Sequence, residues 1–396
     1  MPASRILLFT GKGGVGKTTC AAATAIQAAR AGLRTLILSA DPAHSLADAL
    51  DRPLGPEAVL IEENLWAQEV DLYYSMQKYW GNMRQLMLTV FKWQGVDQIA
   101  AEELAALPGM GEASALLWVD QAYRSGDYDL IVMDAAPTGE TLTLLTLPRV
   151  TQWWLQKAFP FQKTAVKVGG FAVRAATGIP LDKGYEELDK LFTKLADVQT
   201  VLQDPAIGSA RIVMNPERMV IQEARRAYTY LQLYGFNVDA CIVNRVLPAS
   251  AADGPMAGYV EAQAGYLEEI EQTFAPLPIL RVPHLGREAF GVDALADIGA
   301  GLYDGLDPAA VLHEEPTYRL EADGDAYVLA LRVPLLDGQD VDAKQYGDQL
   351  VVQVGNQRLN HLLPNFLRYY VLGDVRVGEG WLRARFEPGA ESGRKR

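Results

Sequence analysis

The chain has 396 residues, 49% of them hydrophobic and 21% charged, which is enough to bury the cores of two domains. A formal net charge of -13 disfavours nucleic acid as a partner, because a protein that binds a phosphate backbone needs basic surface. The two cysteines, Cys20 and Cys241, form no CxxC pair, so neither a disulfide framework nor zinc is expected, and reducing cytoplasm is the expected compartment. No charged leader and no run of ~18 apolar residues is present, so neither secretion nor a membrane span is predicted.

The first predicted elements are a strand, a glycine-rich turn and a helix. Arg5 to Thr10 is predicted to be a short buried strand, and Thr18 to Arg30 an alanine-rich helix. The turn and the helix start read "GKGGVGKT", which satisfies G-x-x-x-x-G-K-[ST]. In this motif backbone N–H groups cradle phosphate oxygens, Lys17 reaches the terminal phosphates, and the Thr18 hydroxyl binds magnesium. The alternative, a glycine-rich turn without a ligand, does not explain the full motif in this setting. The predicted phosphate-binding residues are Gly11, Lys12, Gly13, Gly14, Val15, Gly16, Lys17, Thr18 and Thr19.

Two aspartates follow the next predicted parallel strands. The apolar run from Leu33 to Ser39 leads to Asp41, and the run from Asp129 to Met133 leads to Asp134. Ligands bind outside the carboxyl ends of the strands in doubly wound sheets, so both carboxylates are expected near the bound phosphates. There a carboxylate can orient water or hold magnesium. The alternative for either residue is a cap on the following helix.

The second lysine of the loop, Lys12, gives the motif the form G-K-G-G-V-G-K-T-T. This form resembles the deviant Walker A motif of dimeric ATPases of the signal-recognition and MinD-like class. The resemblance implies a homodimer in which Lys12 reaches the nucleotide of the partner subunit. There it would act like an arginine finger, since it places positive charge where negative charge grows during phosphoryl transfer. A solvated loop lysine is the alternative.

Three further segments, "DPAHS", "DAAPTGETL" and "IVNRVLP", narrow the resemblance. Together with the loop they are similar to the family of the arsenite-pump ATPase and the guided-entry factor for tail-anchored membrane proteins, over about Met1 to Gly305. The resemblance implies that Asp41 positions the attacking water and that Asp41 and Thr18 bind magnesium, directly or through a water molecule. The segment "DPAHS" corresponds to the first switch of the family and "DAAPTGETL" to the second, in which Asp134, Pro137 and Thr138 are expected to contact the nucleotide. The resemblance also implies that Asn244 binds the adenine and that Pro283 lies in the adenine loop. Glu217 is expected to contact the nucleotide of the partner subunit.

The sequence also departs from the family pattern. Ser45 replaces the asparagine that usually ends the first switch, and Glu140 stands where histidine is common in the second. The cysteines that hold an interface zinc in some members, and those that bind arsenite, are missing. One phosphate loop is present, whereas arsenite-pump ATPases commonly carry two.

Two apolar stretches, residues 72–93 and 150–180, are candidates for a client groove. They lie within a predicted helical subdomain at about 66–120 and 150–205. Apolar residues recur at helical spacing in the first, and tryptophans and phenylalanines mix with basic residues and glycines in the second. The family resemblance makes them a groove for the apolar helix of a client, which Met-rich surfaces suit. Periodicity alone fits ordinary core packing better. The candidate groove residues are Met76, Met83, Leu86, Met87, Phe91, Trp153, Trp154 and Phe159.

The last part of the chain is predicted to be a separate β-domain. Residues 306–316 are predicted to be a linker, and 389–396 a solvated tail. Between them four short runs, "AYVLALRVP", "DQLVVQV", "QRLNHLLP" and "WLRARFEP", are typical of strands. Their order over 317–388 is similar to the α-crystallin domain of small heat-shock proteins. That resemblance implies either a second client-holding surface or a structural appendage.

The sequence therefore predicts an α/β fold: a doubly wound, mostly parallel sheet of the P-loop NTPase type with a helical subdomain over 1–305, followed by a small all-β sandwich. The predicted function is a homodimeric ATPase that uses ATP and Mg2+ and binds hydrophobic transmembrane or apolar helices of clients. A transport motor for metalloids or oxyanions, and a nucleotide-regulated holdase, are the alternatives. An iron-sulfur reductase is disfavoured because it needs two suitably placed cysteines.

Overall fold

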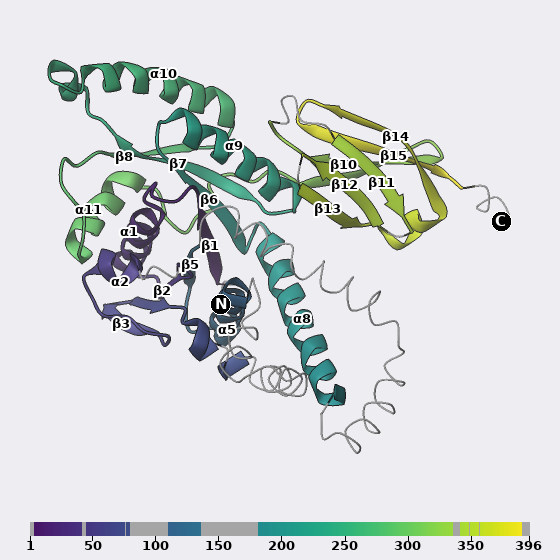
Figure 1. Cartoon of the computed structure of the whole chain (residues 1–396), viewed down its shortest axis with the longest axis horizontal. Coiled ribbons are helices and arrows are strands. Elements are labelled where there is room, and N and C mark those ends of the chain that lie inside the picture. The colour runs from purple at the N-terminus through teal and green to yellow at the C-terminus, as the bar shows by residue number, and fades with distance from the viewer. Residues whose placement is uncertain are drawn as a thin grey trace, which may run out of the picture. The chain divides into compact units, whose positions relative to one another are not determined.

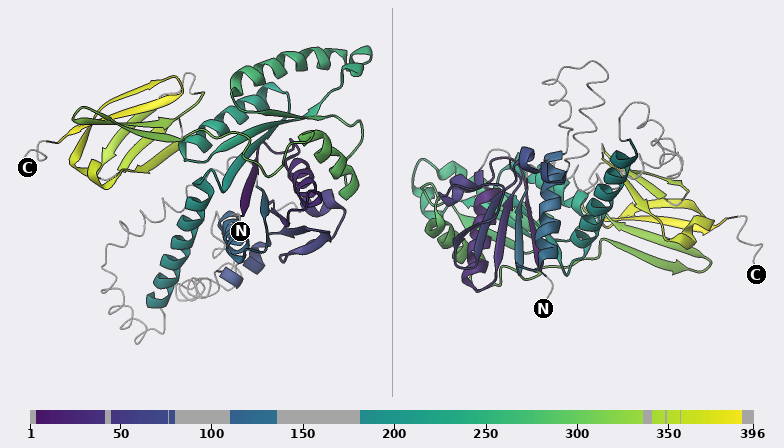
Figure 2. Two further views of the ribbon diagram at one scale, coloured as in Figure 1. Left: turned by 180° about the vertical axis from the view of Figure 1, so that it is seen from behind. Right: turned by 90° about the horizontal axis from the view of Figure 1, so that it is seen from below.

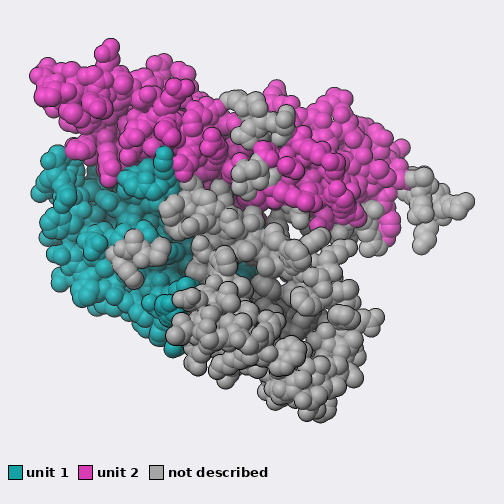
Figure 3. All heavy atoms as spheres, in the orientation of Figure 1, with its two compact units in different colours: residues 1–202, 285–310 teal, residues 203–284, 311–396 magenta. Residues whose placement is uncertain are grey.

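The computed structural model of the chain describes residues 4–41, 45–75, 77–79, 110–135, 181–335, 341–347, 349–355 and 357–389. These residues fall into two compact units, coloured teal and magenta in Figure 3. Unit 1 comprises Met1–Leu202 and Leu285–Ala310, and unit 2 comprises Gln203–His284 and Val311–Arg396. Within the described residues, none of the helices has the length and hydropathy needed to cross a membrane.

Eight strands form the large sheet, and five of them belong to unit 1, in the order β3-β4-β2-β5-β1. Pairs β1/β5, β5/β2 and β2/β4 are parallel, and β3 runs antiparallel to β4. All side chains of β2 and β5 are buried, as expected for strands covered on both faces. The strands are β1 (Arg5–Thr10), β2 (Thr35–Ser39), β3 (Val59–Glu62), β4 (Leu65–Glu69) and β5 (Leu130–Asp134).

Two helices of unit 1, α1 (Lys17–Arg30) and α5 (Met110–Ser125), pack on strands of this part of the sheet. Figure 1 shows α1 and α11 side by side. Their backbones approach closely at Gly299, where a Cβ would lie 2.5 Å from the carbonyl oxygen of Ala23. The hydroxyls of Thr24 and Tyr303, 2.7 Å apart, join the same two helices. The helices are α1 (Lys17–Arg30), α2 (Ser45–Leu50), α5 (Met110–Ser125), α8 (Leu181–Gln203) and α11 (Val292–Tyr303).

Unit 2 contributes three parallel strands of the large sheet, in the order β6-β7-β8. Neighbouring strands β6 and β7 are joined by the fully buried ion pair of Arg211 and Asp239, with 3.0 Å between Nε and Oδ1. The elements of this part are β6 (Gly208–Met214), α9 (Arg218–Leu233), β7 (Val238–Val246), η1 (Ala249–Asp253), α10 (Ala257–Phe274) and β8 (Ile279–Pro283).

The remainder of unit 2 is a β-sandwich, which Figure 2 shows from two further sides. One sheet has the order β14-β15-β10-β9 and the other β11-β12-β13, all antiparallel. Buried leucines, valines and phenylalanine from β10, β12 and β15 form its core. The elements are β9 (Tyr318–Asp323), β10 (Ala326–Arg332), β11 (Val341–Tyr346), β12 (Gln349–Val354), β13 (Gln357–Leu362), η2 (Asn365–Tyr369), β14 (Tyr370–Gly378) and β15 (Trp381–Pro388).

The segment predicted as a linker, 306–316, contains neither helix nor strand, but side chains of unit 2 hold its second half. The Asn237 side chain donates to the carbonyl oxygen of His313 at 2.9 Å, and Glu315 forms an ion pair with Arg332 of β10 at 3.0 Å. The Thr229 hydroxyl of α9 donates to the carbonyl oxygen of Pro334. The sandwich is therefore packed on α9 rather than attached only through a flexible tether.

Most predicted elements are confirmed, including β1 with its predicted bounds, α1, and the four predicted strands of the sandwich. One boundary differs, because residues 66–69, which the predicted helical subdomain included, pair with β2 as strand β4. In the sandwich, three strands were not predicted: β9, β11 and β14. Their side chains are largely exposed, so they lack the apolar alternation that marks a half-buried strand.

Candidate active site

The loop between β1 and α1 has the backbone form that a phosphate-binding loop needs. Gly16, the residue before α1, has φ 92° and ψ 33°, a left-handed backbone conformation that residues other than glycine rarely adopt. No side chain caps the N-terminus of α1, so its first N–H groups are available to an anion. A Cβ on Gly13 or Gly14 would meet nothing within 4 Å, which leaves open space beside the loop. The loop can therefore hold phosphate oxygens.

The two lysines of the loop differ in environment. Lys17 is buried, with 7% of its surface exposed, and its Nζ lies 3.4 Å from the carbonyl oxygen of Lys12. This long contact folds the ammonium group back over the loop, where the terminal phosphates of a bound nucleotide would lie. Lys12 itself is half-buried in the described chain.

Hydroxyls and carboxylates from four elements meet beside the loop. The Thr18 hydroxyl donates to Asp134 Oδ2 at 2.7 Å, and its oxygen lies 3.1 Å from Ser45 Oγ. The Ser45 hydroxyl in turn donates to Asp41 Oδ2 at 3.1 Å. Ser39 Oγ lies 3.4 Å from Asp134 Oδ2 and accepts the N–H of Asp41 at 3.2 Å. The predicted convergence of Thr18, Asp41 and Asp134 is thus present in the structure.

The register of the strands explains why these groups meet. Asp134 is the last residue of β5 and is aligned with Phe9 of β1 on one side and Ser39 of β2 on the other. Parallel strands end at the same edge of a sheet, so the residues that follow β1 and β2 reach the same place as Asp134. The site is therefore built at the carboxyl edge that the sequence predicted.

Burial raises the pKa of the Asp134 carboxyl to about 6. The hydrogen bond from Thr18 and the positive charge of Lys17 oppose this rise, whereas the charge of Asp41 adds to it. The second oxygen of the carboxyl, Oδ1, is buried without a hydrogen-bond partner in the structure. A buried carboxylate with one orphaned oxygen favours a nearby cation.

The donor set fits magnesium. Thr18 and Ser45 have one hydroxyl proton each, and when both carboxylates are ionised these protons go to Asp134 and Asp41. The two hydroxyl oxygens then face each other with lone pairs at 3.1 Å. Hard oxygen donors of this kind are those that Mg2+ prefers, usually with water and nucleotide phosphates completing the shell. Thr18 and Asp134 would hold the ion, and Asp41 would approach it through water.

Ser45 is a contact that the sequence reasoning did not predict. The sequence marked it only as a departure from the family pattern, because a serine after "DPAH" has no motif of its own. Its position at the start of α2, four residues after Asp41, was the available signal.

The other predicted nucleotide contacts in the described residues belong to unit 2. Asn244 is 6% exposed near the end of β7, and its Oδ1 accepts the N–H of Arg245 at 2.9 Å. Glu217 is the residue before α9, and Pro283 ends β8. Their roles at a nucleotide stay predictions, as do those of the phosphate-loop residues. The predicted contacts Pro137 and Thr138, and the eight candidate groove residues, lie outside the described part of the chain.

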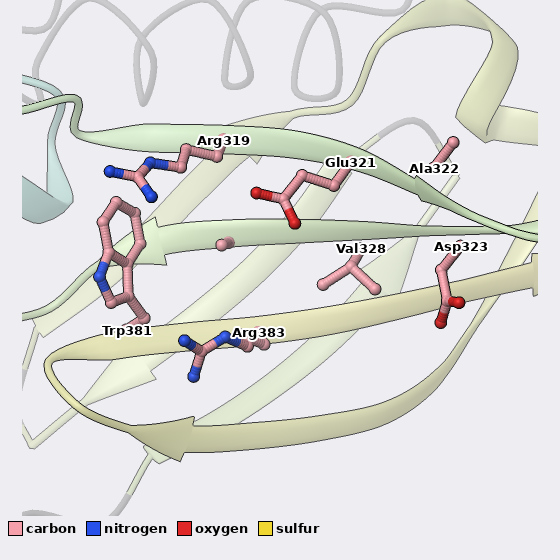
Figure 4. Close-up of a pocket in the computed structure, with 8 residues that line it drawn as sticks. Arg319, Glu321, Ala322, Asp323, Val328, Trp381 and Arg383 are labelled. Atoms are coloured by element: carbon pink, nitrogen blue, oxygen red, sulfur yellow. The ribbon is translucent and has the colours of Figure 1, made fainter.

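A separate cavity of about 390 Å³ lies on the sandwich, over β9, β10 and β15. Figure 4 shows Arg319 beside the ring of Trp381, with Arg383, Glu321 and Asp323 around the same hollow. The guanidinium carbon of Arg319 is 4.7 Å from the Trp381 ring centre, a cation–π contact. This cavity is charged and contains none of the predicted site residues.

Comparisons with known proteins agree with the predicted family. Residues 4–304 match the family described as Anion-transporting ATPase, and residues 324–386 match the HSP20-like domain found in ArsA. A Chlorobaculum tepidum protein named as an arsenical pump-driving ATPase is 39% identical over 388 residues, 97% of this chain and 96% of that protein. A protein of Aquifex aeolicus with the same kind of name is 36% identical, over 92% of this chain and 95% of the relative.

A third relative shows a different chain organisation. A Halobacterium salinarum protein, also named as an arsenical pump-driving ATPase, is 33% identical over 77% of this chain but only 45% of its own length.

The matched family covers the loop, the carboxylate cluster and the large sheet, and the HSP20-like match covers most of the sandwich. The chain therefore belongs to the anion-transporting, or ArsA, ATPase family, and it is an ATPase with a C-terminal HSP20-like domain.

Proposed function

We propose that the chain works as a homodimer in which ATP binding and hydrolysis close and open a hydrophobic groove for the apolar helices of membrane-protein clients, such as tail-anchored proteins. The observation that carries the proposal is the cluster of Thr18, Asp134, Ser45 and Asp41. Asp41 and Ser45 come from the segment that resembles the first switch, and Ser45 contacts Thr18 of the phosphate-loop helix, so the position of this segment can respond to the state of the nucleotide. The HSP20-like domain in the same chain supports a chaperone role.

In the proposed hydrolysis, the backbone N–H groups of the loop and Lys17 hold the phosphates. Bound magnesium would neutralise phosphate charge, held by Thr18 and Asp134. Asp41 orients the attacking water and accepts its proton, a role that needs a carboxylate free to move slightly yet held in place. Lys12 of the partner subunit then stabilises the charge that grows on the transferring phosphoryl group. This trans contact would couple turnover to closure of the dimer.

The first alternative is a metalloid or oxyanion transport motor, favoured by the family description and the names of the relatives. The cysteines do not fit a thiolate site for a soft metalloid. Cys20 in α1 and Cys241 in β7 are both fully buried, and burial raises the pKa of the Cys241 thiol, which disfavours the thiolate that would bind. A metalloid that stimulates ATP turnover would therefore need ligands other than these two cysteines.

The second alternative is a holdase that binds unfolded chains through the sandwich. Half of the residues that line the cavity on the four-stranded sheet are charged, namely two arginines and two acids (Figure 4). Burying an apolar helix there would desolvate these charges without pairing them. This face of the sandwich is a poor surface for apolar clients.

The test is nucleotide-dependent capture of a defined client. A tail-anchored protein made by cell-free synthesis would be offered to the Asp41→Asn variant with ATP, with ADP, or with no nucleotide. The control client has its membrane helix replaced by a polar helix of equal length. We expect capture of the apolar client with ATP and little with ADP. Equal capture of both clients would support the holdase, and turnover stimulated by arsenite or antimonite with no capture would support the transport motor.

The candidate groove is tested by replacing Met83, Leu86 and Met87 with aspartate. If these side chains line the groove, capture is lost while ATP turnover and thermal stability remain. If they are core, the protein unfolds at lower temperature, because each unpaired buried charge costs several kcal/mol, roughly. That second result would contradict the groove.

A further inference from the structure

The Ser45 hydroxyl lies between two groups that the reaction needs: it donates to Asp41 and lies beside the hydroxyl of Thr18. Its hydroxyl oxygen lies 3.1 Å from Asp41 Oδ2 and 3.1 Å from Thr18 Oγ1. Thr18 is the second residue of α1 and Asp41 follows β2, so the two residues lie on separate segments of the chain. A single hydroxyl spans that gap.

The backbone that carries Ser45 is held firmly by unit 1. Ser45 is the first residue of α2, whose Leu46 and Leu50 are 0% and 1% exposed. The N–H of Ala47 donates to the buried Glu69 carboxylate at 2.9 Å, and the carbonyl oxygen of Ala49 accepts the N–H of Gly291 at 2.8 Å. Ser45 is therefore a fixed point beside the loop.

We propose that Ser45 is a positioning residue for ATP hydrolysis, which holds the Asp41 carboxylate in line with the hydroxyl of Thr18. The carboxylate that orients water and the hydroxyl that binds magnesium then keep one geometry during the reaction. The role is selective for turnover, because the hydroxyl of Ser45 acts on Asp41, whereas the loop amides and Lys17 hold the nucleotide. The inference rests on the proposed roles of Asp41 and Thr18 in ATP hydrolysis and is independent of the proposed client function.

The experiment compares steady-state ATP hydrolysis and equilibrium nucleotide binding in Ser45→Ala and Ser45→Thr. Removing a hydrogen bond to a charged group predicts that Ser45→Ala lowers kcat about 10- to 100-fold. The KM for ATP and the affinity for a non-hydrolysable analogue should stay within about threefold. Ser45→Thr keeps the hydroxyl and should recover most of kcat. The matched control is Ser125→Ala at the end of α5, which removes a hydroxyl with local bonds only: it donates to the carbonyl oxygen of Ala122 and accepts the N–H of Asp127.

A double-mutant cycle separates positioning from a structural effect. If Ser45 acts through Asp41, Ser45→Ala adds little in the Asp41→Asn background, as measured by single-turnover hydrolysis of radiolabelled ATP. Unchanged kcat in Ser45→Ala, the same loss in Ser45→Thr, an equal loss of nucleotide affinity, or full additivity with Asp41→Asn would each overturn the proposal. Thermal melts of every variant verify that the fold is intact.

Discussion

Asp41 is held at two points, since its carboxylate accepts a hydrogen bond from Ser45 and its N–H donates to Ser39. A residue fixed in this way can orient water without itself binding the nucleotide tightly. We therefore predict that Asp41→Asn, which keeps the size of the side chain, lowers turnover by ~10²-fold or more while ATP affinity stays near wild type. Steady-state hydrolysis and equilibrium binding of ATP measure the two quantities. Wild-type turnover in Asp41→Asn would remove this residue from the reaction.

Asp134 makes a prediction about stability. Its pKa is raised to about 6 in the folded protein, so the native state binds a proton more readily than the unfolded chain. As pH rises from about 4 to above 6, the buried carboxyl ionises and destabilises the fold, by ~3 kcal/mol for about two pKa units. In EDTA and without nucleotide, Asp134→Asn should therefore be more stable than wild type at pH 7 to 8. That gain should shrink toward pH 4.

Asp129 provides the control for this pH dependence. The hydrogen bond from Arg34 lowers the pKa of Asp129, so its carboxylate stabilises the fold above about pH 4, and that stabilisation is lost as pH falls. Asp129→Asn should accordingly be less stable than wild type at neutral pH, by a small amount because the pair is exposed. Chemical unfolding at several pH values measures both differences. A difference between Asp134→Asn and wild type that does not change with pH would contradict the account.

At the scale of elements, the sequence predicted what buried apolar runs and a specific loop motif determine. β1, β2 and β5 are short stretches with apolar interiors, and the loop requires a strand before it and a helix after it. Their approximate positions could therefore be predicted, and with them the placement of Asp41 and Asp134 at one edge of the sheet. β9 and β14 were missed because they are edge strands whose exposed side chains carry no periodic pattern. Ser45 was missed because its role depends on where α2 is anchored, which contacts distant in sequence decide.

The pairing of β6 with β7 gives a prediction at the same scale. Arg211 and Asp239 are both 0% exposed and form two hydrogen bonds, and Asp239 also lies 3.5 Å from the N–H of Leu312. Asp239→Ala leaves a buried guanidinium without its carboxylate and should cost about 3–5 kcal/mol of unfolding free energy. The double variant Arg211→Met with Asp239→Leu should recover most of that loss, because no charge remains buried.

Urea unfolding measures the free energy of unfolding of each variant. An unchanged slope of free energy against urea concentration verifies that the variants unfold in the same way. A loss of less than about 1 kcal/mol in Asp239→Ala would show that the pair behaves like an exposed one. A double variant no more stable than Asp239→Ala would show that the shape of the pair, rather than its charge, supports the strands.

The whole-molecule question is how two copies would act together. In the proposed dimer, Lys12 of each subunit serves the nucleotide of the other, so each site needs its own Asp41 and its partner's Lys12. Lys12 is half-buried on the loop, which has open space beside Gly13 and Gly14. Removing a charge that stabilises the transferring phosphoryl group costs ~10³-fold in rate by analogy with arginine fingers. Homodimers of Lys12→Ala and of Asp41→Asn should therefore both be nearly inactive.

Mixing these two inactive variants tests whether Lys12 acts on the nucleotide of the partner subunit. In a mixed dimer the Lys12→Ala subunit keeps its own Asp41 and receives Lys12 from the Asp41→Asn subunit, so one of the two sites is complete. After subunit exchange is verified with differential tags, ATP hydrolysis should rise far above that of either parent. Mixed dimers as inactive as their parents would mean that Lys12 acts within its own subunit or not at all. Absence of any mixed dimer in the presence of ATP would contradict the dimer itself.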